Sequence, residues 1–115
     1  MSWPIRLHDA RPESPQIGDM YPAPWMLDAH WDEVLSDEFK RGSRKVPLVV
    51  RLPGGYDFCI DSRARSNGVA YGDGWHPTGE GAAITLTPSI NIGGLYHGWI
   101  QNGVISDDCE GRTFP

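Results

Sequence analysis

The sequence predicts a mainly β fold: a small sandwich or partly closed barrel of about five to seven short antiparallel strands, with one flanking α-helix. Three observations predict it. A chain of 115 residues has the length of one domain. Fourteen Gly and ten Pro residues are about twice the usual share of helix breakers, which excludes a helical bundle. Several short segments alternate apolar and polar side chains, as half-buried strands do.

Residues 1–26 are expected to form an irregular, proline-rich arm. They contain five prolines, and each one removes a backbone donor and restricts the residue before it. A regular helix is therefore excluded, yet the segment carries many large apolar side chains, which a disordered tail rarely does. We expect the arm to wrap over the core. We also expect a short strand within residues 3–8, where every second side chain is apolar.

A single α-helix is predicted over residues 28–41. Asp28 is a suitable N-cap, and Gly42 supplies a C-terminal stop. Acidic side chains near the first turn and basic side chains in the last turn complement the helix dipole. The apolar side chains follow the helical spacing and form one stripe, which we expect to pack on the core: Trp31, Val34, Leu35 and Phe39.

Residues 46–115 are expected to form the β-rich core of this single domain. Two strand patterns on either side of a Pro-Gly-Gly turn predict a first hairpin within residues 46–61. The glycine-rich segment 62–81 is expected to be a loop. Residues 82–87 alternate again, and Pro88 is expected to end that strand.

The clearest hairpin is predicted at residues 96–106. Asn102-Gly103 is the preferred pair for a two-residue type I′ turn, because both residues accept positive φ. The turn sets a register in which His97 lies opposite Asp108. Side chains alternate across a sheet, so the core face carries Gly98, Ile100 and Ile105. The outer face carries His97, Trp99, Gln101, Val104, Ser106 and Asp108.

This outer face is the first candidate contact surface for a partner or ligand, because it joins an imidazole, an indole and a carboxylate. We expect Asp108 to hold the His97 imidazole in its charged form. The alternative interpretation is an ordinary cross-strand ion pair beside a half-buried Trp99. The glycine-rich segment supplies a second candidate surface. The predicted binding residues are therefore His97, Trp99, Gln101, Asp108, Trp75 and His76.

The sequence contains no coherent catalytic set, and the balance of the observations is against an enzyme. Ser89, His97 and Asp108 are the residue types of a hydrolase triad, but the strained G-x-S-x-G turn that exposes such a serine is missing. The weak candidates for metal ligands contain no closely spaced pair: Cys59, His76, His97 and Cys109. A zinc site would have to assemble through the fold, and the alternative is a buried thiol with surface imidazoles.

Nucleic acid is not an expected partner. The net charge is −5, so binding a polyanion would need a strong local basic patch. Two short basic clusters exist, at residues 40–45 and 63–65. The alternative interpretation is that they bind a nucleic acid whose bases stack on the aromatic side chains. These aromatic side chains are more simply explained as core residues and as groups that dock the N-terminal arm onto the core.

We expect a cytoplasmic protein that does not contact a membrane. No stretch approaches the roughly 18 apolar residues of a membrane helix, and the first residues lack the apolar region of a signal peptide. In the cytoplasm Cys59 and Cys109 would be free thiols, whereas secretion by another route would make them a disulfide.

The C-terminal third carries a distinctive pattern. It runs Thr85-Leu86-Thr87-Pro88-Ser89-Ile90, then Tyr96-His97-Gly98-Trp99-Ile100, then Asn102-Gly103-Val104. Over residues 84–105 it resembles a family of functionally uncharacterised small proteins from bacteria and bacteriophages, some of them encoded beside bacterial ubiquitin-like conjugation genes. Some members carry a cysteine just before the histidine, which implies a metal site, but Tyr96 stands there in this chain. The proline-rich opening, Leu52-Pro53-Gly54-Gly55 and Phe58-Cys59-Ile60-Asp61 are similar to the phage branch.

The resemblance implies a phage or prophage origin and brings no established activity. We therefore predict an accessory protein that binds a protein partner without catalysis, a host factor being one version, in the host cytoplasm if it is phage-encoded. The many aromatic residues favour binding, because such residues anchor interfaces. The alternatives are a minor virion component, and a small zinc-binding module or metal-dependent enzyme that uses His97.

Overall fold

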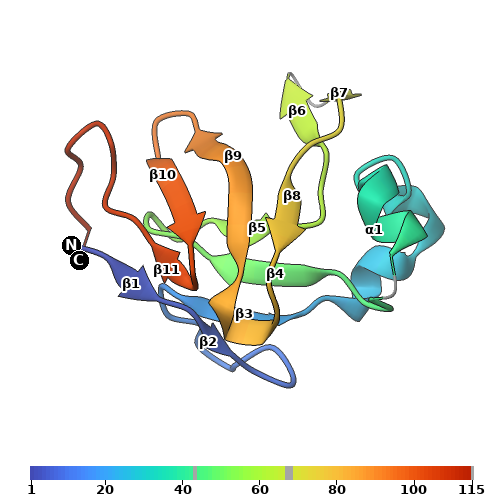
Figure 1. Cartoon of the computed structure of the whole chain (residues 1–115), viewed down its shortest axis with the longest axis horizontal. Helices are drawn as coiled ribbons and strands as arrows, with labels where there is room; N and C mark the ends of the chain where they lie inside the picture. The colour runs from blue at the N-terminus through green and yellow to red at the C-terminus, as the bar shows by residue number, and fades with distance from the viewer. Residues whose placement is uncertain (43, 67–68, 115) are drawn as a thin grey trace.

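The described residues form two main sheets of short strands, a separate two-stranded pair and one short helix, which confirms the mainly β class (Figure 1). A computed structural model of the chain describes residues 1–42, 44–66 and 69–114. The neighbouring strands of the first sheet are all antiparallel. Their order is β1 (Trp3–Pro4), β11 (Val104–Ile105), β10 (Tyr96–Gln101), β9 (Thr85–Ile92) and β8 (His76–Thr78).

The second sheet has four strands, and in it β2 runs parallel to β3 while the other neighbours are antiparallel. Their order is β2 (Arg6–Leu7), β3 (Asp19–Pro22), β4 (Leu48–Arg51) and β5 (Asp57–Cys59). A separate antiparallel pair is formed by β6 (Ala64–Ser66) and β7 (Val69–Tyr71). The described residues also form the 3-10 turns η1 (Pro24–Leu27), η2 (Ala29–Trp31) and η3 (Gly81–Ala83). No helix among the residues that the structure describes has the length and apolar character needed to cross a membrane.

The main core lies between the two sheets, and in the described residues neither sheet closes into a barrel. Leu86, Ile100 and Ile105 enter this core from the five-stranded sheet, and Met20 and Val50 enter it from the four-stranded sheet. The strand β9 crosses over β3 and β4 in Figure 1. A smaller apolar cluster covers the opposite face of the second sheet: Tyr21, Ala23, Met26, Leu35, Val49 and Cys59.

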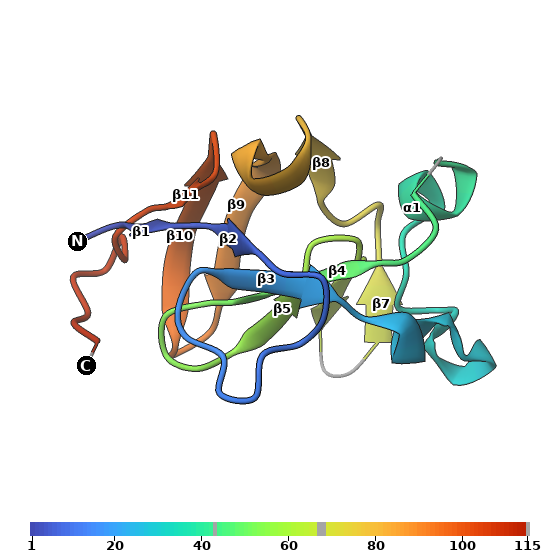
Figure 2. The ribbon, with the colours of Figure 1, turned by 90° about the horizontal axis from the view of Figure 1, so that it is seen from below.

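The proline-rich arm is more regular than predicted. It supplies β1 to one sheet and β2 to the other (Figure 2), so the strand expected within residues 3–8 is present as two short pieces. Asp19–Pro22 form β3, an inner strand of the second sheet. Gly18 lies close against the backbone of Pro4 in β1. Its φ is +98°, and a Cβ there would collide with the Pro4 carbonyl oxygen, so this position needs glycine.

The helix predicted over residues 28–41 is wrong for most of its length. The observed helix, α1, spans Asp37–Arg41. Its N-cap is Ser36, whose hydroxyl accepts a hydrogen bond from the Phe39 N–H at 3.1 Å. Gly42 is the C-cap, as predicted. The five-residue helix therefore keeps the predicted end and loses the predicted beginning.

Pairing with a distant segment explains why the helix begins late. Leu35 forms a β-bridge with Ser62. The Ser36 N–H donates to the Asp61 carbonyl oxygen at 2.8 Å. These contacts hold the chain extended just before α1, and the Asp28 side chain forms no cap hydrogen bond. Tertiary pairing thus overrides a favourable local helix pattern.

Two predictions for the segment between the hairpins are also wrong. Parts of the expected loop 62–81 form strands: β8 pairs with β9, and β6 pairs with β7. The strand β9 does not end at Pro88 but continues to Ile92. Its register against β10 shifts between Gly98 and Ile100, and Pro88 lies opposite this irregularity. At such an irregularity the regular hydrogen bonds between the two strands are interrupted. A proline, which has no backbone N–H to donate, is therefore tolerated.

Both predicted hairpins are confirmed. The first joins β4 to β5, and the second joins β10 to β11 with the predicted pair of Ile100 and Ile105. Asn102 and Gly103 have φ values of +48° and +77°, as a type I′ turn requires. A Cβ at Gly103 would collide with the Ala82 carbonyl oxygen, so glycine is also needed for the close approach of this neighbouring segment.

Candidate functional site

Three of the six predicted binding residues share the outer face of β10. Trp99 is 42% exposed, Gln101 is exposed and His97 is half-buried, while Ile100 and Ile105 on the other face are buried. The rings of His97 and Trp99 are stacked, with centroids 6.2 Å apart and an interplanar angle of 30°. The predicted division into a core face and an outer face is confirmed for these residues. Their role in binding stays a prediction.

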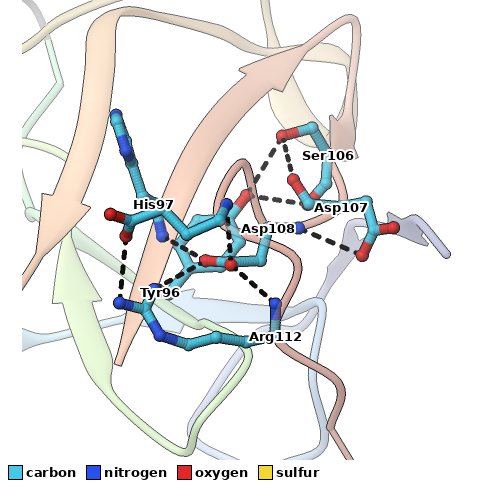
Figure 3. Close-up of polar contacts among 7 residues, drawn as sticks. Tyr96, His97, Ser106, Asp107, Asp108 and Arg112 are labelled. Atoms are coloured by element: carbon cyan, nitrogen blue, oxygen red, sulfur yellow. Dashed lines mark hydrogen bonds and ion pairs between the residues drawn. The ribbon is translucent and has the colours of Figure 1, made fainter. Parts of the chain in front are cut away.

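Asp108 does not lie on this exposed face. Its carboxylate is buried and accepts hydrogen bonds from the backbone N–H groups of His97 at 2.8 Å, Glu110 at 3.0 Å and Arg112 at 2.9 Å (Figure 3). The Arg112 guanidinium adds an ion pair at 2.9 Å. The expected pair between the His97 imidazole and the Asp108 carboxylate is therefore wrong. Figure 3 shows the imidazole pointing away from the carboxylate.

A slip of one residue in the strand pairing explains the position of Asp108. The Ser106 N–H donates to the Trp99 carbonyl oxygen at 2.8 Å, as the predicted register requires. Two residues further from the turn, however, the His97 carbonyl oxygen accepts a hydrogen bond from the Cys109 N–H at 2.7 Å. The predicted register would place the Asp108 N–H there. Such a slip turns a side chain to the other face of the sheet. Burial opposes ionisation of Asp108, but the backbone N–H donors and Arg112 outweigh it and hold the pKa of that carboxyl below its usual value.

Trp75 and His76 occupy positions at the start of β8. The Trp75 ring packs edge-on against the Phe58 ring, with centroids 4.8 Å apart, and its Nε1–H donates to the Ser89 carbonyl oxygen at 3.3 Å. The His76 Nδ1 lies 3.4 Å from a carboxylate oxygen of Glu38 in α1. The six predicted residues therefore do not form one surface.

A groove with a volume of about 460 Å³ lies beside β5, and we call it the β5 groove. Of the predicted binding residues, only Trp75 lines it. Trp25 is 46% exposed and Tyr56 is 41% exposed, so the groove presents aromatic rings to solvent. The aromatic residues that line it are Tyr21, Trp25, Trp31, Tyr56, Phe58 and Trp75.

The four-stranded sheet forms the floor of the β5 groove. Tyr21, Val49 and Cys59 are one cross-strand row on the sheet face that is turned away from the main core. The chain between β3 and α1 forms one wall with Trp31 and Val34, which are half-buried. These two residues belong to the apolar stripe predicted to pack on the core. Both pack against the smaller apolar cluster and also line the groove.

The charged side chains of the β5 groove leave it locally positive. The Arg11 guanidinium lies over the Tyr21 ring, 5.9 Å from the ring centroid. Arg63 also lines the groove. The Asp57 carboxylate is held by the Arg51 guanidinium at 2.6 Å. Within the described ranges, no ion pair involves Arg11 or Arg63.

The cysteines and histidines named as weak metal candidates are not gathered into one site. Burial raises the pKa of the Cys59 thiol to about 12, so the floor of the groove holds no thiolate at neutral pH. Cys109 is exposed, and both thiols are free. Among the residues that the structure describes, no three His, Cys, Asp or Glu side chains lie together as a metal site requires. Cys59, His76, His97 and Cys109 therefore form no such cluster.

Trp25, Trp31 and Tyr56 are groove residues that the sequence analysis missed. Trp31 fitted a helical stripe, and Tyr56 fitted an ordinary strand pattern. The available signal was the position of large aromatic residues beside breakers, since Trp25 follows a proline and Tyr56 follows a glycine. Segments near turns often carry binding residues.

Comparisons with protein-family models, with curated proteins and with solved structures give no match to this chain. The family resemblance of residues 84–105 therefore stays a prediction.

Proposed function

We propose that this protein binds a protein partner through the β5 groove and acts without catalysis. The observation that carries the proposal is the set of accessible aromatic rings on one concave surface, those of Trp25, Trp31, Tyr56 and Trp75. Trp, Tyr and Arg are the residue types that most often dominate the binding energy of protein interfaces. The groove combines all of them.

The shared position of these rings supports a binding role over a purely structural one. Single exposed apolar side chains are common on protein surfaces, and Leu27 and Leu95 are examples in this chain. Trp25 and Tyr56 differ because they border the same cavity. A partner that covers them would bury large apolar areas while few rotatable bonds are immobilised.

The polar groups of the groove support recognition in preference to chemistry. The Cys59 thiol is protonated at neutral pH, because burial raises its pKa to about 12. The Asp57 carboxylate is engaged by Arg51. The two remaining cations, Arg11 and Arg63, are suited to orienting an acidic partner.

The origin and the compartment rest on the family resemblance. We place the gene in a phage or prophage, the protein in the host cytoplasm and the partner among host proteins. The neighbouring genes test this part. A host-takeover cluster would support it, whereas a morphogenesis cluster would favour a minor virion component.

Paired variants of the full chain test the groove itself. The immobilised protein captures its partner from a bacterial lysate, and the partner is then purified so that its dissociation constant can be measured by calorimetry. Trp25→Ala is expected to weaken binding about tenfold or more, as loss of an aromatic anchor usually does. Leu27→Ala is the matched control and should bind like the wild type, because Leu27 is 52% exposed and lies outside the groove.

Trp99→Ala separates the β5 groove from the outer face of β10. The proposal predicts that this variant binds the partner as tightly as the wild type does. If Trp99→Ala abolishes binding while Trp25→Ala leaves it unchanged, the contact surface is the β10 face and the groove assignment is overturned. Circular dichroism of each variant checks that the fold is intact.

A further inference from the structure

The strand β5 is an edge strand, and within the described residues it pairs only with β4. The Leu52 N–H donates to the Tyr56 carbonyl oxygen at 2.8 Å, and the Ile60 N–H donates to the Leu48 carbonyl oxygen at 3.1 Å. These two bonds turn the backbone groups of Tyr56 and Ile60 toward β4.

Alternation along an antiparallel strand turns the backbone groups of Asp57 and Cys59 away from β4. The Cys59 carbonyl oxygen accepts from the Ser62 N–H at 3.3 Å and from the Ser62 hydroxyl at 2.8 Å. No hydrogen bond among the residues that the structure describes uses the Asp57 N–H, the Asp57 carbonyl or the Cys59 N–H. In the described residues this edge therefore leaves two donors and one acceptor without a partner, and Asp57, which carries one donor and the acceptor, is exposed.

The β5 groove runs along this edge. Residues 56–59 are consecutive, and all of them line the groove. Successive side chains of a strand point to opposite faces of a sheet, so a cavity above one face would contact only every second residue. Trp75 and the β9 residues Asn91 and Ile92 also line the groove. The unpaired backbone groups and the aromatic walls thus belong to one site.

We propose that an extended segment of the partner protein adds to the four-stranded sheet beside β5. A large apolar or aromatic side chain of the segment fills the groove, and an acidic side chain next to it lies near Arg11 and Arg63. This inference rests on the proposed function and specifies how the partner is held. In strand addition, main-chain hydrogen bonds supply affinity, and pockets for alternate side chains supply specificity.

Charge complementarity selects the acidic flank. Arg11 and Arg63 line the groove, whereas its acidic side chain, Asp57, is already held by Arg51 at 2.6 Å. A carboxylate of the partner would meet two cations, and a lysine in the same place would be repelled.

A single-stranded nucleic acid is the competing occupant. Aromatic rings with nearby arginines also stack bases. The unpaired N–H and carbonyl groups of Asp57 and the N–H of Cys59 favour a polypeptide, because they match the main chain of a strand. The net charge of −5 opposes a polyanion.

The test uses the full chain and a library of short synthetic peptides with blocked ends. Each peptide has a central Trp, Phe or Leu between alternating Thr and Val residues, with Glu or Lys as flanks. We expect the Glu-flanked peptides to bind about tenfold more tightly than the Lys-flanked ones. In isotope-labelled wild-type protein, the bound peptide should protect the Asp57 and Cys59 amide protons from exchange with D₂O.

Asp57→Pro and Asp57→Ala form a matched pair that isolates the backbone donor. Both variants lose the carboxylate, but only proline also removes the outward N–H, which the four-stranded sheet does not use. We expect the proline variant to bind the Glu-flanked peptides about five- to tenfold more weakly than the alanine variant. The amide protection in the wild type decides the question even if the proline variant fails to fold.

Three outcomes overturn strand addition: a peptide complex in which the Asp57 and Cys59 amides stay unprotected, no binding by any peptide at millimolar concentration, or binding of a mixed-sequence single-stranded oligonucleotide instead of the peptides. The proposed function fails separately, if the purified partner binds Trp25→Ala as tightly as the wild type.

Discussion

The indole of Trp75 packs edge-on against the ring of Phe58, with centroids 4.8 Å apart and an interplanar angle of 89°. Phe58 is buried in the main core, whereas Trp75 is half-buried and packs against that core. Both residues line the β5 groove. The contact fixes one wall of the groove to the core, so little conformational entropy remains to be lost there when a ligand binds.

Phe58→Ala is expected to destabilise the protein by about 3–5 kcal/mol, because it removes a buried ring and its contact with Trp75. Urea unfolding measures the change. Tyr56→Ala, two positions away on the same strand segment and 41% exposed, should cost less than about 1 kcal/mol. A loss below about 1 kcal/mol for Phe58→Ala would show that the ring does not support the core.

Leu35→Ala and Phe39→Ala test the shortened helix. Leu35 is buried at the bridge to Ser62, so its truncation should cost about 2–4 kcal/mol. Phe39 is half-buried in α1, and we expect a loss of about 1 kcal/mol, below the roughly 3–5 kcal/mol that a fully buried ring would give. A loss of about 3–5 kcal/mol for Phe39→Ala would contradict the half-buried position of this ring.

Asp108→Asn is expected to destabilise the protein at neutral pH, and the difference from the wild type should shrink in acid. The pKa of Asp108 in the folded protein lies below the unfolded value of about 3.9. The stabilisation is therefore present above the unfolded value and is lost as the pH falls through the folded pKa.

Unfolding curves collected between about pH 2 and pH 7 measure this difference. Asp9→Asn is the control, because Asp9 is an exposed acidic residue in the arm. A difference in unfolding free energy between Asp108→Asn and the wild type that stays constant over the whole pH range would contradict this prediction. It would show that the charge of the Asp108 carboxylate does not stabilise the fold.

The two cysteines should differ in reactivity in the folded protein. Cys109 is exposed and should react quickly with a thiol reagent at about pH 8. Cys59 should react only after unfolding, because burial raises its pKa to about 12. Cys109→Ser should remove the fast phase. Two unreactive sulfurs after denaturation without reductant would mean a disulfide and would contradict the structure.

The features predicted correctly are those that a few neighbouring residues determine. Asn102-Gly103 specifies its own turn, because both residues accept positive φ. Strand alternation then places Ile100 and Ile105 in the core and Trp99 outside. The same local reasoning correctly predicted the hairpin of β4 and β5.

The features that failed depend on partners far away in the chain. The helix over residues 28–41 competes with the bridge from Leu35 to Ser62, which no local pattern reveals. A slip of one residue, invisible in the sequence, moves Asp108 away from the His97 imidazole. The β5 groove is assembled from segments around residues 25, 56 and 75, so only the folded chain brings its rings together.

A photoreactive benzophenone side chain placed at Tyr56, in living bacterial cells, tests most directly whether the β5 groove holds a protein. Tyr56 is 41% exposed at the groove, so the larger side chain does not enter the core. We predict a discrete covalent adduct with a second protein from this position and none from Leu27, which lies outside the groove. An adduct from the position of Trp99 and none from Tyr56 would contradict the account.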